Sequence, residues 1–208
     1  MDKDPQSSNF FDLGDDPYAN SPRGSNPEQN FPDETPEASP AFVAELQLAN
    51  SEFNINPSVI YVPCSGMGIS PSEAFPGAEV IYLDKNSYAV EALKKAGYNA
   101  VEEDALKFVP TEQVDLVILE NPQISPEFMA RTVKESGYII CNNYSDTATK
   151  MYKLSDFELL GMIRHASDNQ AMDLTKEGVG EYLGNVKESA FNDDIGQFVF
   201  RKKSTDGK

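Results

Sequence analysis

Apolar residues gather in seven short runs along the chain, and polar connections that often contain glycine or proline separate them. The middle runs are continuous rather than alternating, which is typical of parallel strands that are covered on both faces. We therefore predict a mostly parallel sheet. The predicted strands are Val59–Val62, Val80–Leu83, Ala100–Glu103, Val114–Leu119, Tyr138–Cys141, Phe157–Ile163 and Gln197–Arg201.

Helix signals lie between most of these strands. A Ser-Pro pair opens three predicted helices, at Ser39, Ser70 and Ser125, because serine is a favoured N-cap and proline fits the first helical turn. At the second helix, Glu73 stands where a capping box places its acid. The alternation of strands and helices predicts a doubly wound α/β fold. The predicted helices span 39–51, 87–96, 125–135, 146–152 and 173–186, with a helix start at 70 and little more than one turn in 105–113.

The N-terminal segment has a different composition from the rest of the chain. Its first 38 residues hold nine acids, two bases and six prolines, with few aliphatic side chains. Such a segment cannot bury enough apolar surface to offset the entropy lost on ordering. We predict a disordered acidic tail over residues 1–38 and one α/β domain over residues 39–204.

The net charge of −17 argues against nucleic acid as a partner, because binding a polyanion requires clustered lysine and arginine. No apolar run approaches the roughly 20 residues that cross a membrane, and the N-terminus does not resemble a secretory signal. The two cysteines, Cys64 and Cys141, are too few for a disulfide framework. We expect a reduced, cytoplasmic protein with no membrane partner.

One stretch predicts a ligand site. The strand Val59–Val62 runs directly into a turn that contains Gly66 and Gly68, a helix start follows, and the next strand ends on Asp84. Strand, glycine turn, helix, strand and acid is an arrangement that holds nucleotide-like ligands on a parallel sheet. Two structural alternatives stay open, since the glycines could only make a tight turn and Asp84 could cap the next helix together with Asn86.

This pattern resembles the class I S-adenosylmethionine-dependent methyltransferases over residues 41 to 203. The resemblance implies a Rossmann-like sheet of seven strands whose final strand is antiparallel. It also implies that Cys64, Ser65, Gly66 and Gly68 form the turn that binds the cofactor, S-adenosylmethionine. The family's first motif is an acid followed by three alternating glycines, and here Val62 stands at the acid position and Cys64 at the first glycine.

Further site residues follow from the same resemblance. Asp84 falls where the family places the acid that binds the ribose hydroxyls, and Asp104 where an acid contacts the adenine amine. Asn121 begins a segment that resembles the Asn-Pro-Pro-aromatic motif of some members, which makes it a candidate for both catalysis and cofactor binding. The second proline and the aromatic residue of that motif are absent. The implied activity is methyl transfer to a small molecule or a protein, for which the enzyme must align the acceptor and exclude water.

Two other functions also fit the sequence. The acid and glycine missing from the first motif suit a non-catalytic binding module that kept the fold. A nicotinamide dinucleotide protein fits the glycine turn loosely, although Pro71 replaces its third glycine. Cys64 has no evident basic partner, because the single histidine, His165, follows the sixth strand, and we expect a packed, inert cysteine. No residue cluster has the spacing of metal ligands.

Overall fold

The computed structural model describes residues 35–120, 124–164, 179, 183 and 196–204. Several predictions therefore lie outside the described residues, among them those for Asn121, for His165 and for most of the tail. Most of the predicted helix 173–186 also lies outside. Its two described residues, Val179 and Leu183, are helical and buried in the core.

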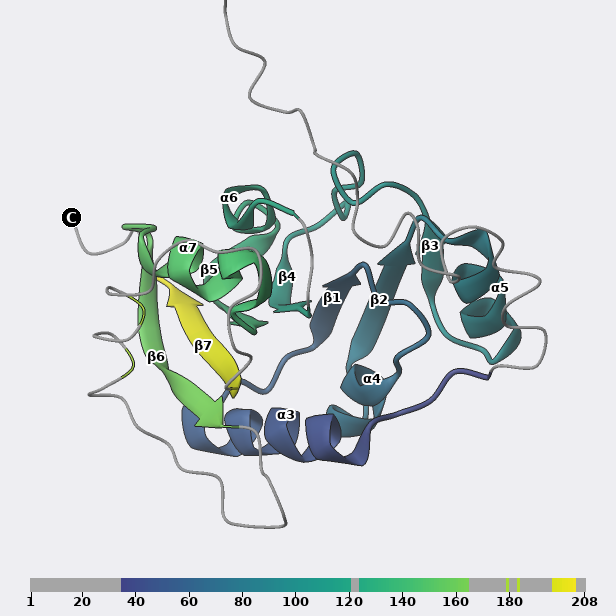
Figure 1. Ribbon diagram of the computed structural model, residues 1–208, viewed down its shortest axis with the longest axis horizontal. Coiled ribbons are helices and arrows are strands. Elements are labelled where there is room, and N and C mark those ends of the chain that lie inside the picture. The colour runs from purple at the N-terminus through teal and green to yellow at the C-terminus, as the bar shows by residue number, and fades with distance from the viewer. Residues whose placement is uncertain (1–34, 121–123, 165–178, 180–182, 184–195, 205–208) are drawn as a thin grey trace, which may run out of the picture. The chain divides into compact units, whose positions relative to one another are not determined.

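The strands form one seven-stranded sheet in the order β3-β2-β1-β4-β5-β7-β6 (Figure 1). The first five strands pair in parallel, whereas β7 is antiparallel to both β5 and β6. This arrangement confirms the predicted α/β class and its antiparallel last strand. The bounds are β1 Val59–Pro63, β2 Glu79–Asp84, β3 Ala100–Glu102, β4 Val114–Leu119, β5 Val133–Cys141, β6 Phe157–Arg164 and β7 Gly196–Lys202.

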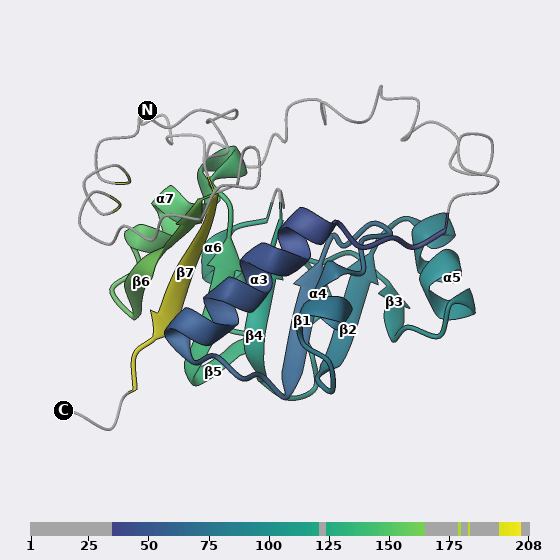
Figure 2. The same ribbon diagram turned by 90° about the horizontal axis from the view of Figure 1, so that it is seen from below.

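Helices cover both faces of the sheet, as the continuous apolar strands require. Along β1, Ile60 and Val62 pack in the apolar cluster on one face, and Tyr61 packs in the cluster on the other. Figure 2 shows α3 crossing the first of these faces, on which α4 and α5 also pack. The bounds are α3 Pro40–Phe53, α4 Ser70–Ala74 and α5 Ser87–Lys95 on this face, with α6 Pro126–Met129, a 3₁₀ turn at Tyr144–Asp146 and α7 Thr147–Tyr152 elsewhere. Buried residues of α6 and α7 belong to the second cluster.

The three Ser-Pro helix starts use their serines differently. Ser39 caps α3 as predicted, since its hydroxyl accepts a hydrogen bond from the backbone N–H of Phe42 at 3.4 Å. The capping box predicted at Ser70 is wrong, because Ile69 is the N-cap residue of α4. The Ser70 hydroxyl instead accepts the backbone N–H of Ser39 at 2.9 Å. Ser125 stands at the N-cap of α6, but its hydroxyl donates to Glu127 and not to the helix backbone.

The predicted helix over 125–135 is too long. Helix α6 ends at Met129, and β5 begins at Val133, which is fully buried and pairs with Val114 of β4. A register shift follows in this strand pair, and Gly137 packs so tightly that a Cβ there would lie 2.9 Å from the carbonyl oxygen of Asp115. Pairing with β4 therefore outweighs the local helical pattern. The single turn predicted after β3 is confirmed, because the backbone N–H groups of Lys107 and Phe108 both donate to the carbonyl of Asp104.

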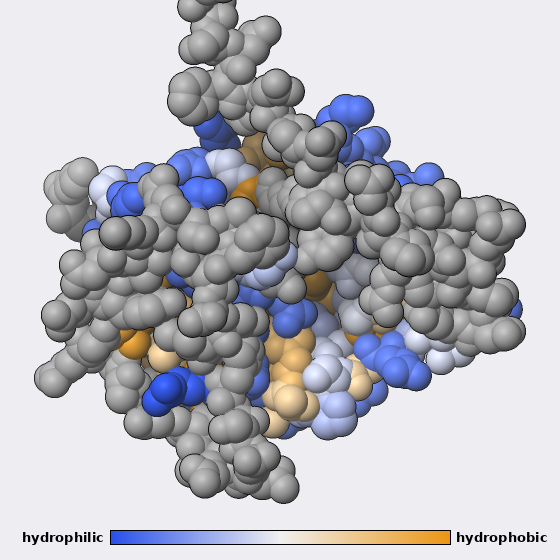
Figure 3. Space-filling view, viewed as in Figure 1, coloured by the Kyte–Doolittle hydropathy of each residue, from blue (hydrophilic) through white to orange (hydrophobic). Residues whose placement is uncertain are grey.

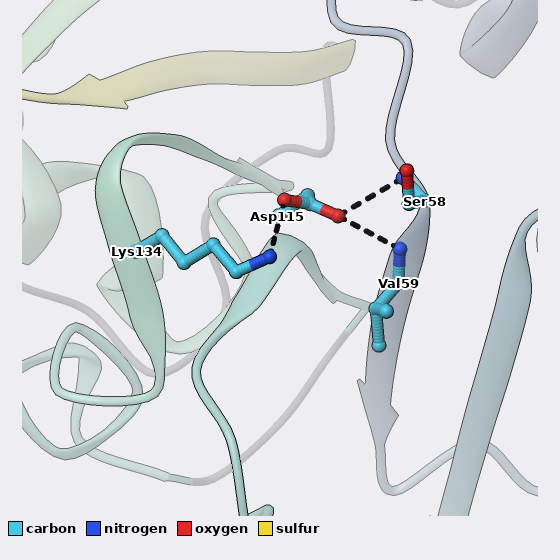
Figure 4. A network of polar contacts seen from close by, with 4 residues as sticks. All are labelled: Ser58, Val59, Asp115 and Lys134. Atoms are coloured by element: carbon cyan, nitrogen blue, oxygen red, sulfur yellow. Dashed lines mark hydrogen bonds and ion pairs between the residues drawn. The ribbon is translucent and has the colours of Figure 1, made fainter.

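A polar network joins three strands at the amino edge of the sheet (Figure 4). One carboxylate oxygen of Asp115 accepts the backbone N–H groups of Ser58 at 3.0 Å and Val59 at 2.9 Å, and the other lies 2.8 Å from the Lys134 ammonium. Partial burial alone raises the pKa of Asp115, but these hydrogen bonds and the charge of Lys134 bring it below its ordinary value. The network therefore links the first residues of β1, β4 and β5 to one another.

On the face shown in Figure 3, apolar residues of the described chain form small areas bordered by hydrophilic ones. The large apolar side chains that are exposed among the described residues are Leu106, Val109 and Tyr152. None of the helices in the described part of the chain combines the length and the hydropathy that a membrane crossing requires.

Candidate functional site

The carboxyl ends of β1, β2 and β4 meet at one edge of the sheet. Strand β1 lies in the middle, with β2 on one side and β4 on the other. The chain therefore continues from β1 to β2 and β3 on one side and then crosses to the other side of β1, where it forms β4. In open α/β sheets, such a switch point leaves a crevice beyond the strand ends, and ligands bind there.

The loop after β1 contains two residues in the left-handed backbone region. Gly66 has a φ of +54°, and Cys64, which occupies the first-glycine position, has a φ of +55°. Gly68 is different, because its φ is not in that region and a Cβ there would meet only the Ser65 carbonyl oxygen, at an ordinary 3.6 Å. The fold thus explains a glycine at position 66 and does not explain one at position 68.

Asp84 ties the glycine loop to the end of β2. One of its carboxylate oxygens accepts the backbone N–H of Gly66 at 2.8 Å, and the other accepts the backbone N–H of Asn86 at 2.9 Å. The Ser65 backbone N–H adds a bond to the Leu83 carbonyl at 3.1 Å. Asn86 itself caps α5 by accepting the Tyr88 N–H. Asp84 therefore sits beside the glycine turn, as predicted, and also supports the start of the next helix.

Asp104 lies after β3, next to the end of β2. The two strands pair at Asp84 and Glu102, and the Glu103 N–H donates to the Asp84 carbonyl at 3.1 Å. The Asp104 carboxylate accepts the backbone N–H of Leu106 at 2.9 Å, so it caps the following turn. This capping bond uses one oxygen of the carboxylate. Asp104 is half-buried, so its remaining acceptor positions can serve a ligand.

The negative charges of Asp84 and Asp104 affect the pKa of the Cys64 thiol in the loop. Loss of hydration, followed by the negative charges of Asp84 and Asp104, raises the pKa of Cys64 to about 11, although Lys85 acts in the opposite direction. The residue is exposed, yet its thiol is protonated at neutral pH. A protonated thiol is a poor nucleophile. The packed position that we predicted for Cys64 is nevertheless wrong, because the residue lies exposed in the loop after β1. The described residues hold no group of three or more potential metal ligands.

A small cavity of about 100 Å³ opens beside the loop. It lies between α3, the end of β1, the start of α4 and the end of β4. Its wall is partly apolar and includes one carboxylate, that of Glu120. The residues lining it are Phe42, Val62, Pro63, Cys64, Ser65, Gly68, Ser70, Pro71, Ile118 and Glu120.

The segment before α3 runs along the outside of the glycine loop. The Glu37 backbone N–H donates to the Met67 carbonyl at 3.2 Å, and the Glu37 carbonyl accepts the Ile69 N–H at 3.0 Å. Together with the bond between Ser39 and Ser70, these contacts hold the loop from its outer side. The sequence pattern did not indicate this pairing, since residues 37 and 38 have the composition of the tail.

The structure thus brings most of the predicted site residues together. Ser65, Gly66 and Asp84 are joined by the hydrogen bonds around the loop, and Asp104 acts on the Cys64 thiol through its charge. Glu120 was not among the predicted site residues. Its position directly after the uninterrupted apolar strand β4 could have indicated that it lies at the carboxyl edge of the sheet, beside the other site residues.

No protein-family model matches the sequence, and no curated protein matches it. Solved structures do match. The N-methyltransferase NodS from Bradyrhizobium japonicum WM9, in complex with S-adenosyl-l-homocysteine (SAH), is 14% identical, with 86% of this chain and 94% of that chain covered and a TM-score of 0.53. The plantazolicin methyltransferase BpumL, in complex with a monoazolic desmethylPZN analog and SAH, is 12% identical, with 79% and 84% covered and a TM-score of 0.51. The chain has the class I methyltransferase fold.

Proposed function

We propose that this protein is a methyltransferase that uses S-adenosylmethionine and acts on a small molecule or a protein. The observation that carries the proposal is the Asp84 carboxylate, which ends β2 and lies 2.8 Å from the Gly66 N–H at the switch point of the sheet. A carboxylate in this place can accept hydrogen bonds from the two hydroxyls of a ribose.

The residues around Asp84 fit an adenosyl group. Each oxygen of its carboxylate accepts one backbone N–H, and an ionised carboxylate offers about four acceptor positions in all. Acceptor capacity therefore remains for both ribose hydroxyls. Gly68 provides a stretch of loop without a side chain, which the fold itself does not need, and close approach of a ligand to the backbone is a physical reason for it.

The contribution of the chain is to position the cofactor. When bound, S-adenosylmethionine supplies a methyl group already activated on a sulfonium centre. Asp84 and Asp104 orient the adenosyl part, and the bond from Gly66 keeps the Asp84 carboxylate in place. The apolar side chains of Phe42 and Ile118 keep water away from one side of the loop. Cys64 stays protonated and does not compete with the acceptor as a nucleophile.

The charge of the protein limits the classes of molecule that can accept the methyl group. A net charge of −17 disfavours DNA and RNA, which supports a small molecule or a protein as the substrate. Among the solved structures, BpumL holds a monoazolic desmethylPZN analog, and NodS is named an N-methyltransferase. We place the activity in the cytoplasm, where a reducing environment keeps Cys64 and Cys141 free, as they are here.

A binding module without catalysis is the second candidate. Its support is that Val62 replaces the acid of the first motif and that Cys64 stands in the left-handed conformation of a missing glycine. The nicotinamide dinucleotide alternative has less support, because the dinucleotide fold has the parallel order 3-2-1-4-5-6, whereas β7 here inserts antiparallel between β5 and β6.

Calorimetric titration of the purified chain with SAH tests the proposal. We expect binding by the wild-type protein and weaker binding by Asp84→Asn, which keeps the size of the side chain and removes its charge. Glu91→Gln is the matched control, since Glu91 is exposed on α5 and the charge change is the same. No heat of binding from the wild-type protein overturns the proposal. Transfer of a labelled methyl group to a component of a cell extract separates an enzyme from the binding module.

A further inference from the structure

The sheet order predicts where the amino-acid end of the cofactor must lie. The adenosyl acids, Asp84 and Asp104, follow β2 and β3, which form one end of the order β3-β2-β1-β4. A ligand whose ribose lies at Asp84 and whose adenine lies toward Asp104 extends its remaining part in the opposite direction. That direction leads past the glycine loop to the ends of β1 and β4.

The cavity beside the loop lies in this direction and has a suitable size. Its volume of about 100 Å³ is well below the roughly 300–1,000 Å³ of pockets that enclose a whole drug-sized ligand. It can therefore take a short tail and not a nucleoside. The methionine part of S-adenosylmethionine is such a tail, and it ends in an ammonium and a carboxylate.

The electrostatics of the cavity suit the ammonium. Of the described residues that line it, Glu120 is the one with a formal charge at neutral pH, because Cys64 is protonated there. Glu120 is exposed at the end of β4, so its carboxylate is not withdrawn into the core. A carboxylate that meets an ammonium in a partly enclosed site forms a charge-assisted hydrogen bond, which is stronger than a neutral one.

Strand register explains why the acid comes from β4. Ile60 pairs with Leu116 and Tyr61 with Val117, so the two strands run side by side, and Cys64 and Glu120, which directly follow β1 and β4, line the same cavity. Val62 is buried in the apolar cluster beneath α3 and cannot bind an ammonium. Val62 and Glu120 both line the cavity, so its carboxylate comes from the end of β4 and not from β1.

We propose that Glu120 binds the α-ammonium group of the methionine part of the cofactor. This inference rests on the proposed function. It assigns Glu120 as a residue that recognises the amino-acid part of the ligand, with no part in holding the adenosyl group.

Two ligands separate these roles, namely SAH, which has the ammonium, and 5′-methylthioadenosine, which lacks the whole amino-acid part. We expect Glu120→Gln to weaken SAH binding by about tenfold or more while its affinity for methylthioadenosine stays within about twofold of wild type. Glu120→Asp keeps the carboxylate and should lose less SAH affinity than Glu120→Gln. Glu91→Gln, with the same loss of charge on α5, should bind both ligands as the wild-type protein does.

The outcomes are distinct for the two proposals. If the wild-type protein binds neither ligand, the proposed function fails, and the role of Glu120 fails with it. If the wild-type protein binds SAH and Glu120→Gln binds it equally well, the role of Glu120 alone is refuted. Equal losses for both ligands also refute it, because the amino-acid part is then not what Glu120 recognises. Thermal unfolding of each variant shows whether a loss of binding comes from a loss of folded protein.

Discussion

Gly68 offers a test that separates the fold of the loop from its function. A Cβ at this position would meet only the Ser65 carbonyl oxygen at 3.6 Å, which is an ordinary contact, and the backbone is outside the left-handed region. Gly68→Ala should therefore leave the free energy of unfolding unchanged or raise it by up to about 1 kcal/mol, since alanine loses less chain entropy on folding. Its new methyl group nevertheless projects from the loop where we place the cofactor, so SAH affinity should fall by about tenfold or more.

Gly66→Ala is the matched comparison and should show the opposite stability effect. Gly66 has a φ of +54° with no heavy atom within 4 Å of the added Cβ, so the cost is backbone strain and not a clash. Left-handed backbone costs a residue with a side chain about 1–2 kcal/mol. For a chain of this length, a loss of about 1 kcal/mol lowers Tm by roughly 2–4 °C.

Thermal or urea unfolding and SAH titration of the two variants check this reasoning together. The expected result is a variant at position 68 that is stable but binds poorly and a variant at position 66 that is less stable. If Gly68→Ala binds SAH with wild-type affinity, the cofactor does not approach this loop. If Gly68→Ala unfolds as easily as Gly66→Ala, our account of the loop backbone is wrong.

Three further predictions concern other parts of the chain. The Cys64 thiol should react slowly with iodoacetamide at pH 7 and faster as the pH rises toward about 11. Asp84→Asn removes one of the negative charges that raise the thiol pKa, so it should lower this pKa and speed the reaction at a given pH. A reaction rate that is the same in Asp84→Asn and in the wild-type protein contradicts this account. The pKa of Asp115 is lowered in the folded state, so this residue stabilises the protein above its unfolded pKa of about 3.9, and the stabilisation is lost as the pH falls through the folded pKa. The free energy of unfolding of Asp115→Asn, measured in urea at several pH values, should lack this part of the acid dependence. Ser39→Ala removes the cap of α3 and should lower the free energy of unfolding by about 1 kcal/mol in urea, whereas Ser51→Ala, near the other end of α3, should have a smaller effect.

The strands were predictable because each one is a local apolar run. All seven predicted strands occur, and most have bounds within one or two residues of those observed. The largest error concerns β5, which begins at Val133 inside a predicted helix. A helical pattern of Phe128, Met129 and Val133 is local information, whereas the pairing of Val133 with Val114 depends on a strand 19 residues earlier in the sequence. Local patterns cannot weigh such a contact.

The glycine turn, Asp84 and Asp104 could be found from the sequence because each one directly follows a recognisable strand. The partners of these residues could not be found in that way. The bond from Ser39 to the Ser70 hydroxyl, the pairing of Glu37 with the loop, and the position of Glu120 at the cavity all join segments that are far apart in the chain. A serine before a proline predicts a helix cap equally well whether or not another segment needs its hydroxyl.

The sequence by itself determined the α/β class, the glycine turn and the acids that end the strands, because burial on both faces and backbone conformation act on neighbouring residues. Only the tertiary structure decided that β1 and β4 lie side by side, that the Gly66 N–H binds Asp84, and that the acid of the cavity comes from β4 and not from β1. The physical reason is that strand order and register arise from contacts between distant segments, and these contacts bring together the groups that make a site.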